Sequence, residues 1–165
     1  MLDEVTRMCM ATVLETIPEF EGDARRVFEV LPNFTFEQMR AMLEGDCRND
    51  LHRIMAAVDE EGHVRGYSAY SLKRDSEEKL YGYLFSRGID PKYRRQGIAA
   101  RLLEGEEAWF RSEGAEYIQA ETHVTNVALR TLLEKHGFSL SGPVKGHWPY
   151  YILRKELFCP GTTPK

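Results

Sequence analysis

A short basic segment at residues 89–99 holds the residues best suited to chemistry, because it combines cationic side chains with a glycine ahead of an apolar helical pattern. Arg94 and Arg95 can pair with phosphate oxygens, and Gly97 lets the backbone come close to a ligand. Free N–H groups at the start of the following helix also favour an anion. The segment therefore predicts a pyrophosphate site, and the alternative is a solvated basic loop before an ordinary helix. The chain contains neither Gly-Lys-Thr/Ser nor Gly-x-Gly-x-x-Gly, which excludes the Walker-type and dinucleotide phosphate loops.

The periodicity of the apolar residues indicates the elements that carry this segment. Tyr81, Tyr83 and Phe85 alternate on an aromatic strand that leads into it. A polar turn through Glu61 and Gly62 joins two earlier strands into an antiparallel hairpin. The predicted elements are, in chain order, a strand over 8–13, helices over 23–31 and 35–44, strands over 51–58, 64–72 and 80–89, a helix over 98–112, a strand over 117–124, a helix over 126–136 and two strands within 138–158. Together they predict one α/β domain, mixed and α+β-like, over residues 1–165.

The composition suits a single soluble domain. The chain has 165 residues, of which 42% are apolar and 29% charged, and this excludes a largely disordered chain. No apolar run approaches the roughly 20 residues that cross a bilayer, so we expect no membrane partner and a cytoplasmic location. Cys9, Cys47 and Cys159 lack metal-ligand spacing, so we expect neither a metal site nor a disulfide framework.

Charge is distributed unevenly along the chain. The net charge of −4 argues against a nucleic-acid partner. Residues 1–63 contain 14 acidic and 6 basic side chains, whereas residues 64–165 contain 12 acidic and 16 basic ones. Either solvated helix faces account for this difference, or the two parts face ligands of opposite charge, with a cation on the N-terminal side and an anion at the basic segment.

Two motifs in this order resemble the GNAT superfamily of acyl-CoA-dependent N-acetyltransferases. Arg94, Gly97 and Ala99 match its pyrophosphate motif, Arg/Gln-x-x-Gly-x-Gly/Ala, and Ile89-Asp90-Pro91 matches the Val/Ile-x-Pro that precedes it. The residues that match the second motif, Asn-x-Ala followed by Glu-Lys-x-Gly-Phe, are Asn126, Ala128, Glu134, Lys135, Gly137 and Phe138. The resemblance implies a mixed central sheet of about six or seven strands, flanked by helices, with a splayed pair of parallel strands.

By this resemblance, acetyl-CoA binds as the acyl donor between the strands at 80–89 and 117–124. Gly88 and Ile89 lie where the family has a strand bulge, and the Ile89 N–H would polarise the thioester carbonyl. Asn126 would cap its helix and contact the pantetheine arm. The pyrophosphate would be bound by the residues that offer free amides or cations, Arg94, Arg95, Gln96, Gly97, Ile98 and Ala99.

The acceptor in this family is an amine, which must lose a proton before it attacks, and a carboxylate is a usual base for that step. Gln119, Glu121 and His123 share one face of the predicted strand. Glu121 lies five residues before Asn126, where the family's ribosomal-protein acetyltransferases carry a general base. Glu121 is therefore the predicted base and His123 the alternative one. The alternative roles are structural: Glu121 would be a surface or salt-bridged strand glutamate, and His123 a strand-end histidine that makes a hydrogen bond.

One position departs from the family pattern. Many members have a tyrosine four residues before the Gly-Phe pair, which protonates the departing CoA thiolate, whereas this chain has Leu133 there. Either CoA leaves as a thiolate or another group donates the proton. Tyr150 and Tyr151, on a late strand, are the candidate acids, and packing in an aromatic core is the alternative role for both.

The resemblance thus implies an N-acetyltransferase that moves an acetyl group from acetyl-CoA directly to a primary amine. The acceptor would be a small-molecule amine or a protein amino group, and family members are often homodimers. Leu133 keeps a second hypothesis open, a catalytically silent acyl-CoA-binding module that senses or regulates. A third is an interaction domain of the same fold without CoA, against which the intact basic segment argues.

Overall fold

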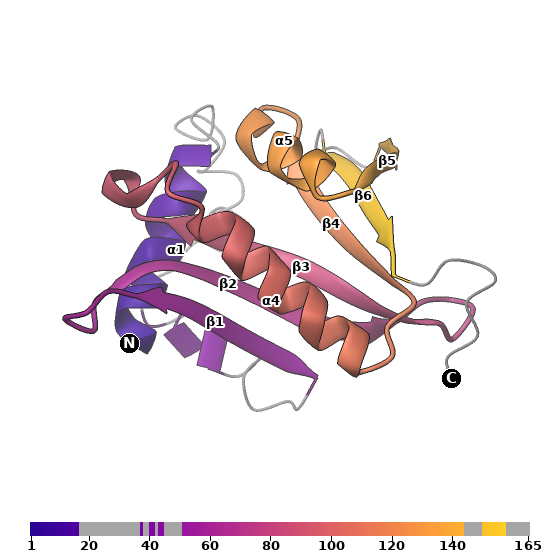
Figure 1. Cartoon of the computed structure of the whole chain (residues 1–165), viewed down its shortest axis with the longest axis horizontal. Coiled ribbons are helices and arrows are strands. Elements are labelled where there is room, and N and C mark those ends of the chain that lie inside the picture. Colours follow the sequence, from indigo (N-terminus) through magenta and orange to yellow (C-terminus); the bar gives the residue numbers. More distant parts are fainter. Residues whose placement is uncertain (17–36, 38–39, 42, 45–50, 144–149, 158–165) are drawn as a thin grey trace. The chain divides into compact units, whose positions relative to one another are not determined.

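The computed structural model describes residues 1–16, 37, 40, 41, 43, 44, 51–143 and 150–157. In chain order the elements are helix α1 (Leu2–Thr16), strands β1 (His52–Val58), β2 (Val64–Arg74) and β3 (Leu80–Ile89), the short 3₁₀ helix η1 (Pro91–Tyr93), helix α4 (Ile98–Ser112), strand β4 (Tyr117–His123), helix α5 (Val127–Lys135) and strands β5 (Ser139–Pro143) and β6 (Tyr150–Glu156) (Figure 1).

The strands form a six-stranded sheet in the order β1-β2-β3-β4-β6-β5. Strand β4 runs parallel to β3 and antiparallel to β6, and β5 is antiparallel to β6. This mixed sheet confirms the predicted α/β fold with its parallel strand pair. The β3–β4 ladder ends at the pair Leu84↔Ala120, whereas β4 pairs with β6 as far as His123. Within the described residues, β4 therefore continues beyond its last pair with β3.

The N-terminal segment differs from the prediction, because the strand expected over Met8–Val13 is part of helix α1. Asp3 and Glu4 lie in the first turn, where their negative charges interact favourably with the positive end of the helix dipole. Val5 and Cys9 are one helical turn apart and are both buried. The apolar residues here follow the helical period, so the strand prediction was wrong.

The other predicted N-terminal elements are described only in part. The helix expected over residues 23–31 lies outside the described residues, as do Thr35 and Gln38, the proposed cap of the next one. Leu43 of that second helix is helical and completely buried. Arg40 pairs with Asp3 of α1 at 2.7 Å.

The chain divides into two compact units. The first contains residues 1–69 and 86–102, and the second contains residues 70–85 and 103–165. Strands β2 and β3 and helix α4 therefore each contribute residues to both units.

In the first unit, a glycine allows β2 to lie close to both ends of the basic segment. A Cβ atom at Gly66 would lie 2.7 Å from Ile89 Cδ1 and 3.0 Å from Ile98 Cγ2. Ile89 is the last residue of β3 and Ile98 is the first residue of α4. Both ends of the segment 90–97 therefore lie close to β2 at Gly66.

In the second unit, helices cover one face of the sheet. A Cβ atom at Gly82 would lie 2.6 Å from the Phe110 ring, so glycine is what lets α4 pack against β3. Ile118 pairs with Gly82, shares its face and is fully buried. Tyr151 lies on this same face by the β4–β6 register, and the guanidinium of Arg130 in α5 is 5.6 Å from its ring centroid. Residues that alternate with these therefore point to the opposite face.

Candidate active site

The basic segment begins with a tight turn that Asp90 closes. Its carboxylate accepts the Lys92 N–H at 3.0 Å, and its carbonyl accepts the Tyr93 N–H at 2.8 Å. The Asp90 N–H donates to the Arg65 carbonyl at 2.9 Å. The turn is therefore tied to β2 through the backbone as well as closed on itself.

Two residues with left-handed backbone angles shape the segment before α4. Arg95 has a φ of 64° and Gly97 a φ of 80°. This conformation is uncommon for a residue with a side chain and tends to occur at functional sites. A Cβ atom at Gly97 would meet no atom within 4 Å, so the backbone angle rather than space calls for glycine. The Arg101 N–H donates to the Gly97 carbonyl at 3.1 Å, and residues 98–100 form the first turn, where helices offer free N–H donors.

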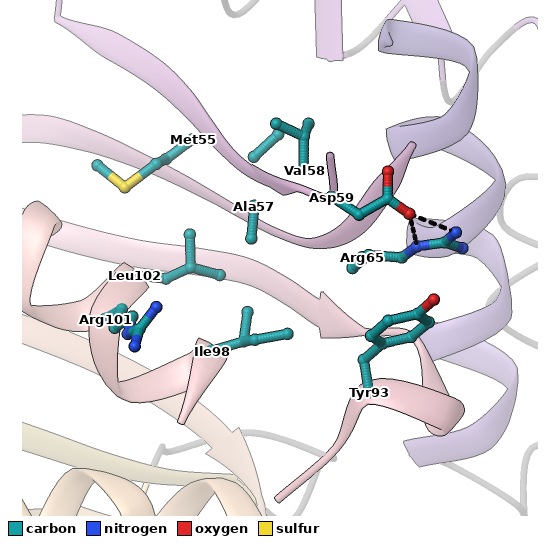
Figure 2. Close-up of a pocket in the computed structure, with 10 residues that line it drawn as sticks. Met55, Ala57, Val58, Asp59, Arg65, Tyr93, Ile98, Arg101 and Leu102 are labelled. Atoms are coloured by element: carbon teal, nitrogen blue, oxygen red, sulfur yellow. Dashed lines mark hydrogen bonds and ion pairs between the residues drawn. The ribbon is translucent and has the colours of Figure 1, made fainter. Parts of the chain in front are cut away.

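Arg65 of β2 is the centre of an ion cluster, and Figure 2 shows it paired with Asp59 near the ring of Tyr93. Arg65 Nε donates to the Asp59 carboxylate at 2.7 Å, and its Nη1 lies 3.5 Å from the Asp90 carboxylate. The guanidinium carbon also lies 4.5 Å from the centroid of the Tyr93 ring. The His63 N–H and the Arg65 guanidinium hold the pKa of Asp59 below its usual value. Arg65 is thus a bridge from the β1–β2 turn to the basic segment.

A pocket of about 300 Å³ lies beside this segment (Figure 2). Its lining is mainly apolar and comes from β1, the β1–β2 turn, β2, η1 and α4, with Met55, Val58, Arg65, Tyr93, Ile98 and Leu102 among the residues. Ile98 is the residue that the pocket shares with the predicted cofactor set. The pocket therefore adjoins the predicted phosphate loop from the side of β1.

The predicted cofactor residues of the first unit lie together at the junction of β3 and α4. Gly88 is buried, and Ile89, Ile98 and Ala99 are half-buried. The residues between them that were predicted to contact phosphate are exposed, namely Arg94, Arg95, Gln96 and Gly97. The chain thus presents an exposed cationic loop here, between two ends that are less exposed.

The second unit contains the predicted base and acids. The β4–β6 register pairs His123 with Tyr150 and Glu121 with Ile152, and Tyr151 pairs on the alternate position. Because paired residues share a face and neighbours alternate, Glu121, His123 and Tyr150 lie on one face. The structure therefore brings Glu121 together with Tyr150 and places Tyr151 on the opposite, helix-covered face.

Glu121 is exposed, and its carboxylate forms no hydrogen bond or ion pair with the residues that the structure describes. Three tyrosines lie within its electrostatic reach. Burial and the Glu121 carboxylate raise the pKa of Tyr83 to about 12. The same two causes raise the pKa of Tyr150, and they raise that of Tyr81 against the opposing charge of Arg154. The Glu121 carboxylate thus shares this face with three tyrosines whose raised pKa values favour the neutral phenol.

The buried ring of His123 is held in one tautomer. Its Nδ1 accepts the Thr125 backbone N–H at 3.3 Å and lies 2.6 Å from the Thr125 hydroxyl. Since a backbone N–H can only donate, Nδ1 is the acceptor and Nε2 carries the proton in the neutral ring. The ring also meets Tyr150 edge-on, with centroids 5.5 Å apart. In this state Nε2 is a donor, so the neutral ring does not offer Nε2 as a proton acceptor.

The start of α5 agrees with the sequence. Asn126 caps the helix, and its side-chain oxygen accepts the Leu129 N–H at 3.2 Å. This confirms the predicted capping role. Leu133, which occupies the position of the family's acid, is fully buried in the core and has no group that can move a proton.

Two features of the site were not assigned roles from the sequence. Alternation placed Tyr83 on an aromatic face, but its proximity to Glu121 depends on the pairing of β3 with β4. No sequence pattern indicated that Arg65 belongs to the site, because a single arginine at the start of a strand is usually a solvated residue. Both became visible only through contacts between residues far apart in the chain.

The described part of the chain shows no group of three or more His, Cys, Asp or Glu residues that could hold a metal ion. Among the described helices, none is long and apolar enough to cross a membrane.

Solved structures share this fold. A GNAT-family protein from Desulfovibrio desulfuricans superposes with a TM-score of 0.63 at 21% identity, covering 87% of this chain and 96% of that one. The NatC complex bound to a Gag peptide and CoA gives a TM-score of 0.63 at 22% identity, covering 76% of this chain and 82% of that one. At these identities the likeness establishes the fold.

The sequence also matches a family model, that of the Acetyltransferase (GNAT) family, over residues 14–138. The chain belongs to this family. It is also 29% identical over 89 residues to the aminoglycoside N(6')-acetyltransferase type 1 of Klebsiella aerogenes. That match covers 52% of this chain and spans only 59% of the length of the relative.

Proposed function

We propose that the protein is an N-acetyltransferase that takes the acetyl group of acetyl-CoA and transfers it directly to a primary amine. Membership of the acetyltransferase family supports the reaction class. The observation that carries the proposal is the exposed carboxylate of Glu121, which has no partner among the described residues and lies on β4 just beyond the last pair of the β3–β4 ladder. A free carboxylate there is suited to take a proton from an ammonium group.

The basic segment fits the diphosphate of acetyl-CoA. Arg94 and Arg95 are exposed cations, and the left-handed angles of Arg95 and Gly97 lead directly into the first turn of α4. Cations and free helix N–H donors together match the charge and the acceptor oxygens of a diphosphate. In this proposal Gln96, Ile98 and Ala99 add backbone contacts, Gly88 and Ile89 contact the thioester end, and Asn126 contacts the pantetheine arm.

The proposed reaction forms an amide bond and breaks the thioester. Glu121 removes a proton from the acceptor ammonium, and the free amine nitrogen forms a bond to the thioester carbonyl carbon. By the family resemblance, the Ile89 N–H would donate to the carbonyl oxygen as negative charge develops there. The carbon–sulfur bond then breaks, and the sulfur leaves with the electron pair. The nitrogen releases its second proton to solvent, and the sulfur gains a proton from a donor that solvent then reprotonates. The products are an amide, a thiol and one net proton, which Glu121 returns to solvent.

We assign the proton donor for the sulfur to Tyr150. Its hydroxyl is on the same face as Glu121, and its raised pKa keeps the phenol protonated at neutral pH. Tyr151 lies on the opposite face, with its ring against Arg130. Of the two tyrosines proposed from the sequence, Tyr150 therefore has the geometric support.

The acceptor is either a small-molecule amine or a protein amino group. The relative from Klebsiella aerogenes is an aminoglycoside acetyltransferase, and the NatC complex of similar fold was solved with a peptide and CoA. The two therefore support one acceptor class each, and both acceptors belong in the experimental panel.

The test combines binding with turnover. Calorimetric titration with acetyl-CoA should show binding in the wild type that the double variant Arg94→Ala, Arg95→Ala weakens. Thiol release should then be measured against a panel of polyamines, amino sugars and peptides. Glu121→Gln should abolish amine-dependent release at neutral pH while acetyl-CoA binding persists. Glu134→Gln, an exposed glutamate of α5, is the matched control. Unchanged turnover in Glu121→Gln would remove this residue from the mechanism.

One observation favours a second function, a catalytically silent acyl-CoA-binding module. Leu133 is fully buried where many relatives have the acid, so that proton donor is missing from its usual place. Acetyl-CoA binding without thiol release from any amine in the panel would support this module over the enzyme.

A further inference from the structure

One face of the sheet in the second unit gathers tyrosine rings from three strands. Tyr81 pairs with Tyr117, and their rings stack at a centroid distance of 5.0 Å. Tyr83 follows on the same side of β3, and Tyr150 of β6 lies on the same side of the sheet by the β4–β6 register. We call these four residues the tyrosine face. It is opposite to the face that α4 and α5 cover.

Two cations already lie on the tyrosine face. Lys73 Nζ is 3.9 Å from the centroid of the Tyr83 ring, and Arg154 Cζ is 4.7 Å from that of Tyr117. Arg154 is engaged further, because its Nε donates to Gln119 at 2.9 Å. Lys73 is exposed and forms no hydrogen bond or ion pair with the described residues. Its ammonium group therefore interacts with the ring of Tyr83 and with no carboxylate among the described residues.

The Glu121 carboxylate lies on this face as well, because Tyr83 pairs with Gln119 and Glu121 is the next residue on the same side of β4. Its charge contributes to raising the pKa of Tyr83. An aromatic ring beside an anion is the usual recognition chemistry for an organic ammonium ion. Lys73 and Glu121 flank the same ring without forming an ion pair with each other. The face thus presents an ammonium ion and a free carboxylate on either side of one tyrosine.

We propose that the ring of Tyr83 binds the ammonium group of the acceptor next to Glu121, and that Lys73 is an internal ammonium which occupies the ring until the acceptor displaces it. Tyr83 is then a specificity residue that selects protonated alkylamines over neutral molecules of the same size. Arg154 does not compete, because its guanidinium remains over Tyr117 and hydrogen-bonded to Gln119. This inference rests on the proposed amine acetyltransferase activity, since it assigns the place where the amine waits for deprotonation.

The test uses the full chain without acetyl-CoA, and its probes are tetramethylammonium and the neutral tert-butanol, titrated by ligand-observed NMR. Tetramethylammonium should bind and tert-butanol should not. Lys73→Met should tighten tetramethylammonium binding at least twofold relative to Lys79→Met, which removes an equal charge from an exposed lysine paired with Glu77. In the Lys73→Met background, Tyr83→Leu should weaken binding by about twofold to thirtyfold, and Tyr83→Phe should retain it because the ring remains.

Equal affinity in Lys73→Met and Lys79→Met would overturn the proposal. So would undiminished affinity after Tyr83→Leu, or an equal loss with Tyr83→Phe, which would assign binding to the hydroxyl group. Circular dichroism establishes that each variant is folded. Acetyl-CoA calorimetry and thiol release are measured separately, so an enzyme that lacks this cation site is distinguished from a protein that binds cations but does not transfer acetyl groups.

Discussion

Replacing Gly97 with alanine tests whether the basic segment needs glycine for its backbone angle rather than for lack of space. Gly97 has a φ of 80°, and a Cβ atom there would meet no atom within 4 Å. The substitution therefore introduces backbone strain alone, which costs about 1–2 kcal/mol for a residue with a side chain. This strain must be paid on folding, or on acetyl-CoA binding if the free loop relaxes to an ordinary backbone angle.

Gly114 provides a matched control within the same chain. It also has a φ of 80°, and a Cβ atom there would also meet no atom within 4 Å. It ends α4, where its N–H donates to the Arg111 carbonyl and the next residue, Ala115, is completely buried. Because this helix end cannot relax independently, Gly114→Ala should lose the full 1–2 kcal/mol or so of unfolding free energy and leave acetyl-CoA affinity unchanged.

The assay is urea unfolding combined with acetyl-CoA calorimetry on both variants. For Gly97→Ala, the loss of unfolding free energy and the loss of binding free energy should together amount to about 1–2 kcal/mol. If the loop relaxes fully in the free protein, binding weakens by about fivefold to thirtyfold, since each 1.36 kcal/mol is a factor of about ten. The reasoning is refuted if the two losses for Gly97→Ala together stay well below about 1 kcal/mol, or if Gly114→Ala weakens acetyl-CoA binding.

Three further outcomes are expected. Gly82→Ala forces a Cβ atom to within 2.6 Å of the rigid Phe110 ring, so urea unfolding should show a loss of about 1–3 kcal/mol, and wild-type stability would contradict the packing described here. The pKa of Asp59 is lowered in the folded state, so its stabilising contribution is present above about pH 4 and is lost below it. Asp59→Asn should therefore make the melting temperature fall less steeply as the pH is lowered. An unchanged pH dependence would argue against the ion cluster. Burial and Glu121 raise the pKa of Tyr83 to about 12, and burial and Asp75 raise that of Tyr117 to about 12 as well. Alkaline absorbance titration should therefore show late-ionising tyrosines, whose amplitude Tyr83→Phe reduces and part of which Glu121→Gln shifts to lower pH; a titration that Glu121→Gln leaves unmoved would place the carboxylate farther away.

Local features of the chain could be predicted from its sequence because they depend on neighbouring residues. The alternating pattern of residues 80–89, the cap at Asn126 and the helix after the basic segment all appear in the structure as expected. The same local logic failed at Met8–Val13, where a short apolar run suits either a strand or a helix. Burial of Val5 and Cys9 on one side selects the helix, and burial depends on what the segment packs against.

The arrangement of the candidate site depends on contacts between distant parts of the chain. Reading the residues alone identifies Glu121, Tyr150 and the basic segment as candidates and shows two motifs in the order that resembles an acetyltransferase. It could not separate Tyr150 from Tyr151, because a shift of one residue in strand register exchanges their faces. Nor could it join Tyr83 to Glu121, since that proximity arises from the pairing of two strands far apart in the chain. Residue types and local periods are written in the chain, whereas register and pairing are set by the packing of the whole sheet.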